Sequence, residues 1–341
     1  MSRYRKQTLF APIGEAGQAR LARSHVAVVG CGALGSASSE QLARAGVGRL
    51  TLVDRDFVEL SNLQRQTLYT EADAAARTPK AVAAAARLAA VNSDVEITRE
   101  VADLTPESID RLLGGADLVL DGLDNFESRF LLNDWAAETA TPWIYTGCVG
   151  SGGQVLLVRP GRSACLACVV PEPPAPGESE TCDTTGVIGP AVQTVVGLQA
   201  ALALRFLATG DAPASLFAVD VWPPSLREIS TEGLRDRSGC PTCHHGRRDW
   251  LRSERGSRTA ILCGRNAVQV TPENAATSLD EVADRIGADH PVERTPFLLR
   301  VQLSAGDPPL TATLFRDGRA IIQGTEDPAA ARMAYNRLVG T

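Results

Sequence analysis

The chain has 341 residues, with 34 Lys and Arg against 40 Asp and Glu, so its formal net charge is −6. Its hydrophobic content of 44% and charged content of 22% are ordinary for a globular protein and exclude wholesale disorder. The mild acidity and the aromatic content of 5% argue against a nucleic-acid binder, which needs a concentrated cationic surface or aromatic stacking platforms.

We recognise no export signal and no lipid-facing helix in the sequence, and therefore expect a cytoplasmic protein without membrane association. The N-terminus is basic but leads into no apolar stretch of signal-peptide length. Residues 187–204 carry no charged side chain, yet their glycine, proline and glutamine content makes them too polar for a lipid-facing helix and favours a buried one. The eight cysteines are therefore expected to be reduced thiols.

The first part of the chain alternates predicted strands and helices. Residues 12–23 predict a short helix, and His25–Val29 is a continuous apolar run, typical of a parallel strand buried on both faces. A glycine-rich turn then opens a helix that reaches Ala45. Further strands are expected at 49–54, 95–101 and 118–121, and further helices at 79–91 and 105–113. This alternation predicts an α/β fold with a doubly wound, mainly parallel, Rossmann-like sheet.

The second part predicts the end of this domain and a smaller one. A strand pair at 147–158, a proline-rich loop at 170–180, the buried helix and a strand at 215–221 complete the first domain, and an arginine-rich linker follows. The tail predicts strands at 260–262, 267–270 and 297–303, helices at 278–286 and from Pro328, and a hairpin at 310–324. The expected organisation is an N-terminal arm at 1–20, a large domain at 21–245, a linker at 246–259 and a small C-terminal α+β domain at 260–341.

Three glycines form a motif that is typical of phosphate binding when it lies between a buried strand and a helix, as it does here. Gly30, Gly32 and Gly35 follow a buried strand and open a helix, whose N-terminal N–H groups suit a phosphate. Asp54 ends the next strand, where an acid accepts hydrogen bonds from ribose hydroxyls. The plain alternative is that small residues only allow the helix to pack on the strand. Taken alone, the motif suits NAD or FAD as much as ATP.

The residues after Asp54 favour a triphosphate. Asp56 is followed by Asn62, Arg65 and Gln66, and Lys80 then opens the next helix. Two cations at this place are unnecessary for a dinucleotide oxidoreductase but suit the four negative charges of ATP. The alternative is a solvated polar loop.

An acidic turn follows the strand at 118–121, at the edge of the sheet where ligands bind in such folds. Of the two acids in Asp121–Asn125, we expect Asp124 to stand further into the crevice and to bind Mg²⁺. Arg129 and Asn133 lie five and nine residues beyond it and are expected to share a face of the next helix. Taken alone, an acidic turn would only be a helix cap.

Two Cys-x-x-C pairs predict a zinc site. Cys165 and Cys168 form the first pair, and Cys240 and Cys243 the second. Four thiolates suit a closed, tetrahedral, structural zinc site, which we favour over a redox dithiol because the pairs match.

Cys182 stands apart from these pairs. It lies just before the buried helix, where the helix dipole favours a thiolate, and is either a nucleophile or persulfide carrier or a small buried residue. Cys31, Cys148 and Cys263 are expected to serve packing.

Together these segments resemble the ThiF/MoeB family of sulfur-carrier adenylyltransferases, which is part of the ubiquitin-activating-enzyme-like superfamily. The resemblance extends over about residues 3–245. The matching segments are Val29–Gly35, Leu52–Asp56, Ser61–Gln66, Pro79–Lys80, Asp121–Asn125, both Cys-x-x-C pairs and Thr181–Cys182.

The resemblance implies a homodimer that uses ATP and Mg²⁺ to adenylate the C-terminal glycine of a small ubiquitin-fold carrier ending in Gly-Gly. Pyrophosphate is released, and the carrier is primed for thiocarboxylate formation in thiamine or molybdenum-cofactor biosynthesis, with a sulfurtransferase as a possible further partner. Carried over by motif, the Gly30–Gly35 turn holds the phosphates and Asp54 the ribose. Asn62, Arg65 and Lys80 bind the triphosphate, and Asp124 binds the metal. The expected catalytic residues are Arg65, Lys80, Asp124 and Cys182, and Asp56, Gln66 and Asn125 complete the nucleotide site.

The chain departs from the family pattern at two places. Lys6 stands where the family has an arginine that enters the partner subunit's ATP site; Arg5 is the alternative. The shorter family members lack the region after residue 258. Two other functions are weighed: an NAD-dependent oxidoreductase, which needs a catalytic His or Lys that the four histidines do not supply, and a non-catalytic zinc-stabilised binding protein, which the set of charged site residues argues against.

Overall fold

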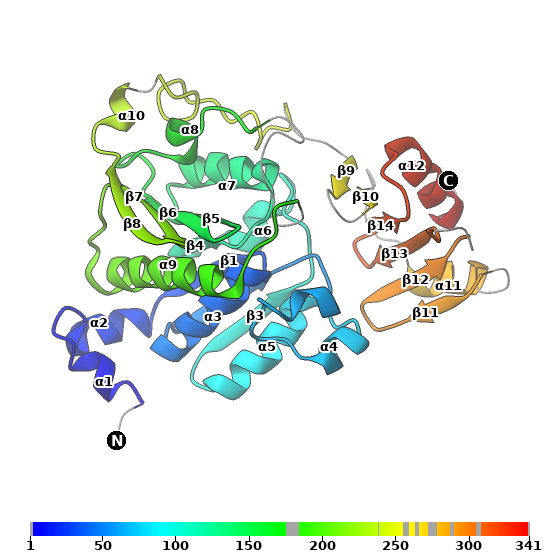
Figure 1. The fold of residues 1–341 in the computed structure, drawn as a ribbon, viewed down its shortest axis with the longest axis horizontal. Helices are drawn as coiled ribbons and strands as arrows, with labels where there is room; N and C mark the ends of the chain where they lie inside the picture. Colours follow the sequence, from blue (N-terminus) through cyan, green and yellow to red (C-terminus); the bar gives the residue numbers. More distant parts are fainter. Residues whose placement is uncertain are drawn as a thin grey trace. The chain divides into compact units, whose positions relative to one another are not determined.

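A computed structural model describes residues 3–174, 184–237, 239–254, 259–262, 266–271, 278–286, 290–304 and 308–339. The chain divides into two compact units, Met1–Arg255 and Gly256–Thr341 (Figure 1). Each unit has its own sheet and its own hydrophobic core.

The first unit is built on an eight-stranded sheet in the order β3-β2-β1-β4-β5-β6-β7-β8. Its strands are β1 (His25–Val29), β2 (Arg49–Val53), β3 (Glu96–Glu100), β4 (Leu118–Asp121), β5 (Trp143–Val149), β6 (Gly152–Val158), β7 (Ser215–Val221) and β8 (Pro224–Ser230). From β3 to β5 the neighbours are parallel, and from β5 to β8 they are antiparallel. The predicted α/β, doubly wound, Rossmann-like sheet is confirmed.

Helices cover both faces of this sheet, as Figure 1 shows. The helices are α1 (Arg5–Thr8), α2 (Gly14–Leu21), α3 (Ala33–Ala45), the 3₁₀ turn η1 (Leu60–Asn62), α4 (Glu71–Ala75), α5 (Lys80–Val91), α6 (Ile109–Leu113), α7 (Phe126–Thr139), α8 (Leu166–Val169), α9 (Gly189–Thr209) and α10 (Leu234–Arg237). One core joins α3, α5 and α9 to the sheet, and a second core joins α6, α7 and α8 to the opposite face. In β1, Val26 and Val28 enter the first core, and Ala27 and Val29 the second, which explains the continuous apolar run.

The long apolar helix α9 lies within the first core. It is long and apolar enough to cross a membrane by length and composition, but about half of it is buried inside the unit. Val192, Val195 and Val196 are fully buried, and the helix packs against α2, α3 and β6. The buried helix predicted at 187–204 is confirmed, although it runs five residues further.

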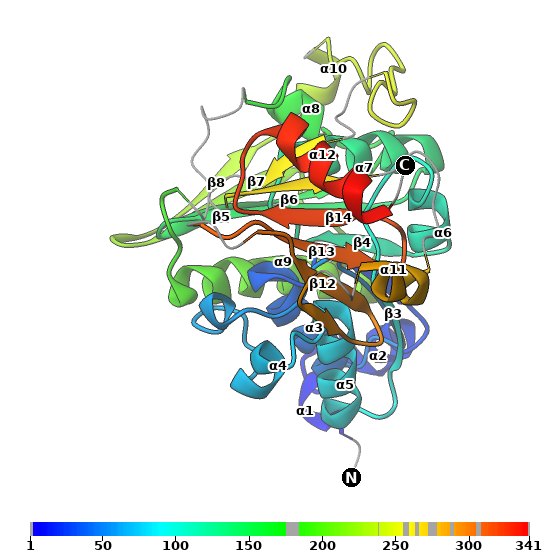
Figure 2. The same ribbon diagram turned by 90° about the vertical axis from the view of Figure 1, so that its right-hand side faces the viewer.

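The second unit is a six-stranded antiparallel sheet with two helices on one face. Its strands follow the order β11-β12-β13-β14-β10-β9. They are β9 (Thr259–Leu262), β10 (Ala267–Val270), β11 (Val292–Arg294), β12 (Leu298–Gln302), β13 (Thr311–Phe315) and β14 (Ala320–Gln323), and the helices are α11 (Leu279–Ile286) and α12 (Pro328–Val339). Figure 2 shows α12 across β14, with which it shares a core. Asp327 caps α12, accepting a hydrogen bond from the Ala329 N–H at 2.8 Å.

Candidate active site

In the glycine turn between β1 and α3, backbone packing requires two of the three motif glycines but not Gly32. Gly30 has a φ of +85°, and a Cβ there would lie 2.5 Å from the Gly122 carbonyl oxygen. A Cβ on Gly35 would lie 1.8 Å from the Gly30 carbonyl, so both glycines are required by close backbone packing. A Cβ on Gly32 would meet nothing closer than Gln66 Nε2, at 3.9 Å. Gly32 is therefore the motif glycine that packing leaves unexplained, and it lies at the end of the helix that attracts phosphate.

Asp54 follows β2 beside this turn. Its carboxylate accepts hydrogen bonds from the Cys31 and Asp56 N–H groups, both at 2.6 Å. Burial raises the pKa of this carboxyl, and the nearby Lys80 ammonium acts in the opposite direction. Each oxygen keeps one further lone pair, so Asp54 can still accept from a ribose hydroxyl.

Lys80 is held at the start of α5 by Asp56. Its side chain is only 5% exposed, and Nζ lies 3.2 Å from Asp56 Oδ2. The Tyr69 hydroxyl donates to the Cys31 carbonyl at 2.6 Å and also lies 3.3 Å from the Lys80 carbonyl. The glycine turn and the start of α5 are therefore joined, and an ammonium group is fixed next to the turn.

The segment around η1 places a polar side chain beside Gly32. Asn62 Oδ1 accepts from the Glu59 N–H at 3.0 Å and closes the turn, and the half-buried Arg65 donates to the Ser61 carbonyl at 3.0 Å. Gln66 is buried, and among the described residues its Oε1 has no hydrogen-bond partner. A buried amide oxygen without a protein partner needs a donor, which a hydroxyl or amino group of a nucleotide, or a water, supplies.

The loop after β4 separates the two acids of the Asp121–Asn125 segment. Asp121 is fully buried and pairs with Arg129, whose Nε lies 2.9 Å from Oδ2. Asp124 is exposed, and Asn125 Nδ2 donates to it at 3.1 Å. Asn125 also caps α7, accepting from the Ser128 N–H at 2.8 Å. Of the two acids, Asp124 is therefore the one whose side chain is open to solvent and to a cation.

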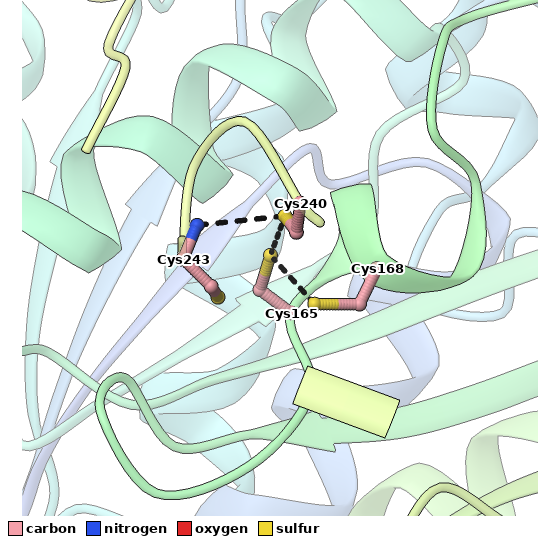
Figure 3. A group of neighbouring side chains, drawn as sticks. All are labelled: Cys165, Cys168, Cys240 and Cys243. Atoms are coloured by element: carbon pink, nitrogen blue, oxygen red, sulfur yellow. Dashed lines mark hydrogen bonds between the residues drawn. The ribbon is translucent and has the colours of Figure 1, made fainter. Parts of the chain in front are cut away.

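The four cysteines of the two Cys-x-x-C pairs come together (Figure 3). Their Sγ atoms all lie within 4.8 Å of one another, with Cys165 at 3.8 Å from Cys168 and at 3.6 Å from Cys240. Cys165, Cys168 and Cys240 are buried, while Cys243 is half-buried. The cluster could hold a metal ion, as the spacing of the pairs predicted.

Comparison with known proteins then decides the family. The family model described as "ThiF family" matches residues 4–242, more than two thirds of the chain. The chain belongs to the ThiF family. It is 41% identical over 99% of both chains to the sulfur carrier protein ThiS adenylyltransferase of Bacillus subtilis. It is 38% identical to the sulfur carrier protein ThiS adenylyltransferase of Escherichia coli, over 71% of this chain and 94% of that one.

A solved structure agrees on the fold. The crystal structure of E. coli MccB with succinimide superposes with a TM-score of 0.60 at 20% identity, over 68% of this chain and 72% of that one. The resemblance found from the motifs is thus confirmed, and the enzyme class of this ThiF family member is adenylyltransferase. This decides against the oxidoreductase and the non-catalytic binding protein.

The structure also shows how the predicted residues relate. The motif segments from β1, β2 and β4 meet at one edge of the sheet, because these strands are neighbours and parallel. Arg129 and Asn133 lie four residues apart on α7 and so share a face as expected; both are buried, and Arg129 contacts Asp121 whereas Asn133 contacts Cys165. Cys182 and Cys263 lie outside the described residues.

Two residues of the site carried no recognisable signal in the sequence. Tyr69 ties the glycine turn to α5, and Gln199, fully buried on α9, donates from Nε2 to the Asp121 carbonyl at 3.0 Å. Their spacing from the motifs gave no reason to select them. A polar residue inside an otherwise apolar helix, as at Gln199, is the one hint available for such a contact.

Proposed function

We propose that the chain adenylates the C-terminal glycine of a small ubiquitin-fold sulfur carrier that ends in Gly-Gly. The carboxylate of the carrier attacks the α-phosphorus of ATP, the bond to the bridging oxygen of the β-phosphate breaks, and pyrophosphate leaves. The resulting acyl-adenylate primes the carrier for thiocarboxylate formation in thiamine or molybdenum-cofactor biosynthesis. The 41% identity to a ThiS adenylyltransferase over 99% of the chain supports this substrate class.

The observation that carries the proposal is Gly32, a glycine at the N-terminus of α3 that backbone packing does not require. The space in front of it is bordered by the first turn of α3 and by Nε2 of buried Gln66, with Lys80 held nearby. We assign the phosphates to the Gly30–Gly35 turn and the ribose to Asp54. N–H groups and cations fixed in advance stabilise charge on a transferring phosphoryl group without rearranging during the reaction.

The remaining nucleotide contacts are assigned to charged and polar side chains around this space. Arg65 and Lys80 neutralise the triphosphate, with Asp56 holding Lys80 in place and Asn62, Gln66 and Asn125 completing the site. We assign Mg²⁺ to Asp124, because this carboxylate is exposed whereas Asp121 is used by Arg129. Bound there, Mg²⁺ would neutralise phosphate charge. Cys182 is kept as a candidate nucleophile or persulfide carrier.

We infer that the four cysteines hold Zn²⁺. Metal–sulfur bonds of about 2.3 Å in a tetrahedron place the sulfurs about 3.8 Å apart. The observed Sγ separations of 3.6 and 3.8 Å fit this geometry. Four protein ligands leave no position for substrate, so the ion would be structural. Reduced thiols of this kind agree with the proposed cytoplasmic location.

We also propose a homodimer in which the N-terminal arm reaches the partner's nucleotide site. Tyr4 packs against Gly46 and its hydroxyl accepts from Asn92 Nδ2 at 2.8 Å, so the arm is anchored on its own subunit. Both Lys6 and Arg5 are exposed beyond this anchor. Lys6 keeps the positive charge of the usual family arginine but loses its two-pronged geometry.

Mass spectrometry of the carrier tests the proposed reaction. The enzyme is incubated with ATP, Mg²⁺ and candidate carriers, and with the same carriers lacking the last glycine. We expect one carrier to gain the mass of one adenylyl group and its truncated form to gain none. Equal modification of both forms would contradict attack by the C-terminal glycine.

A further inference from the structure

Helix α7 lies between the Asp124 loop and the four-cysteine cluster. Asn125, Arg129 and Asn133 follow one another at intervals of four residues, which places them along one face of the helix. At 1.5 Å per residue, Asn125 and Asn133 are about 12 Å apart along the helix axis. All three side chains are engaged, each with a different neighbour.

Arg129 fastens the first half of α7 to the loop. Its Nε donates to Asp121 Oδ2 at 2.9 Å, and its Nη2 donates to the Leu123 carbonyl at 2.6 Å and to the Thr146 carbonyl at 2.9 Å. Asp121 in turn accepts from the Leu123 N–H at 2.8 Å. At Leu123, just before Asp124, the backbone N–H is held by Asp121 and the carbonyl by Arg129. Because Asp121 is paired with Arg129, both contacts depend on Arg129.

Asn133 fastens the second half of α7 to the cysteine cluster. It is 1% exposed, and its Oδ1 accepts from the Leu166 N–H at 2.9 Å, between the two cysteines of the first pair. Its Nδ2 donates to Cys165 Sγ at 3.7 Å and lies 3.5 Å from Thr242 Oγ1, between the two cysteines of the second pair. One side chain thus contacts both Cys-x-x-C segments.

We propose that α7 couples the cysteine cluster to the nucleotide site, with Asn133 and Arg129 as its positioning residues. Formation of the metal site fixes Cys165 and Leu166, Asn133 fixes α7 on them, and Arg129 sets the loop that carries Asp124. Close-packed interiors pass such displacements on rather than absorbing them. The coupling rests on the proposed function in assigning Asp124 to the nucleotide and Zn²⁺ to the four cysteines.

A coupling of this kind is reciprocal. If occupation of the cysteine cluster raises the affinity for Mg²⁺-ATP by some factor, Mg²⁺-ATP must raise the affinity for Zn²⁺ by the same factor. If the metal only stabilised the fold, a variant of Asn133 that folds and still holds Zn²⁺ would bind the nucleotide as tightly as the unmodified protein does. This difference separates a positioning role from a purely structural one.

Asn133→Asp is the variant that tests the link. It keeps the acceptor for the Leu166 N–H and replaces the donor toward Cys165 by an oxygen that repels a thiolate. Thr139→Ala is the matched control, because Thr139 is exposed on the same helix and, within the described part of the chain, its hydroxyl bonds only within α7 and to Thr141. Zinc content is measured first, on the full-length protein.

In zinc-loaded Asn133→Asp we expect hydrogen exchange in the segment 122–128 to accelerate at least fivefold without nucleotide. Affinity for ATP in saturating Mg²⁺ should fall at least fivefold, while both quantities stay unchanged in Thr139→Ala. A zinc-loaded Asn133→Asp protein that matches the control in both would overturn the proposal.

A second variant keeps the test decisive if Asn133→Asp loses zinc or fails to fold. Arg129→Lys changes a side chain with no contact to the cysteines among those described. We expect its Zn²⁺ affinity, measured by competition with a chelator, to fall at least threefold. Unchanged Zn²⁺ affinity would contradict the coupling. Because exchange and Zn²⁺ affinity are measured without ATP, failure of adenylation would leave this result standing.

Discussion

Gly32 and Gly35 belong to one turn but have different surroundings, and this difference yields the sharpest prediction for a single residue. A methyl group on Gly32 meets no atom within 3.8 Å, whereas one on Gly35 would overlap the Gly30 carbonyl oxygen. Because φ at Gly32 is −71° and the methyl group meets no close atom, Gly32→Ala should cost at most about 1 kcal/mol of folding stability. Its methyl would occupy the space assigned to phosphate, so ATP affinity should fall at least tenfold in titration calorimetry.

Gly35→Ala should lower folding stability before it lowers ATP affinity. The backbone must move to admit the methyl group, so the loss should appear first in folding stability, measured by denaturant unfolding. A Gly32→Ala protein that binds ATP as tightly as the unmodified protein would show that the phosphates lie elsewhere.

The two acids of the β4 loop give a second contrast between single residues. Asp124→Asn should abolish adenylation while the free energy of unfolding changes by less than about 0.5 kcal/mol, because the side chain is exposed. Asp121→Asn removes the partner of buried Arg129 and should cost about 3 kcal/mol or more. Urea unfolding and adenylation assays on both variants check this, and full activity of Asp124→Asn would show that the metal is assigned to the wrong residue.

At the scale of elements, the sequence predicted the fully buried strands β1 and β4 with their exact bounds, because strands buried on both faces are continuous apolar runs. β3 and β7 were also expected within one residue of their bounds, although both are only partly buried. β8 was not expected, since every residue of it is exposed and no alternation with a core face exists. The helix expected at 105–113 begins only at Ile109, because the Ser108 hydroxyl accepts from the Thr105 N–H and donates to the Asp103 carbonyl, which forms a turn.

Only those parts of the candidate site that lie within short sequence motifs could be predicted from the sequence. The glycine turn, each acidic segment and each cysteine pair is a short contiguous motif. The segments that follow β1, β2 and β4 meet because of the order of the strands. The ties that hold them in place join distant segments: Asn133 to Thr242, Gln199 to Asp121 and Tyr69 to Cys31. Such partners are set by packing of elements and not by spacing along the chain.

The central strand β1 also yields a pH prediction. Burial lowers the pKa of His25 below 6.5, and Arg49, whose Nη2 lies 3.0 Å from Nδ1, lowers it further. The Gly115 carbonyl and the acids Asp117 and Glu96 act in the opposite direction but do not outweigh burial. The folded state therefore favours the neutral ring, so His25 stabilises the fold fully above about pH 6.5 and this contribution is lost as the pH falls.

The measurement is urea unfolding between pH 7.5 and 5.5. Stability of the unmodified protein should decline on acidification over this interval. His25→Gln, whose amide can still bond Thr51, should show a shallower decline. Equal slopes for the two proteins would show that His25 does not carry the effect.

At the scale of the molecule, two units with separate cores should respond separately to loss of metal. The cysteine cluster joins α8 to the segment after α10, both in the first unit. Removing Zn²⁺ should therefore lower the melting temperature of the first unit by about 10 °C, corresponding to several kcal/mol. The transition of the second unit, which contributes no ligand to the cluster among its described residues, should not shift. Calorimetry before and after chelation measures both, and a shift of both transitions would contradict this account.

The alignment with the Bacillus subtilis relative covers 99% of both chains and therefore includes the second unit. The E. coli relative aligns over 71% of this chain and 94% of its own, and the family match ends at residue 242. Every described residue of the proposed nucleotide site lies in the first unit. Adenylation should thus be explained by the first unit's residues alone.

ATP–pyrophosphate exchange is the most direct test of the central claim, that this site adenylates a carrier. The unmodified enzyme and Asp124→Asn are assayed with Mg²⁺ and a panel of carriers that end in Gly-Gly. The account predicts exchange that requires one particular carrier, is absent without it, and is lost in Asp124→Asn. Absence of exchange with every carrier, together with binding of NADH in place of ATP, would contradict it.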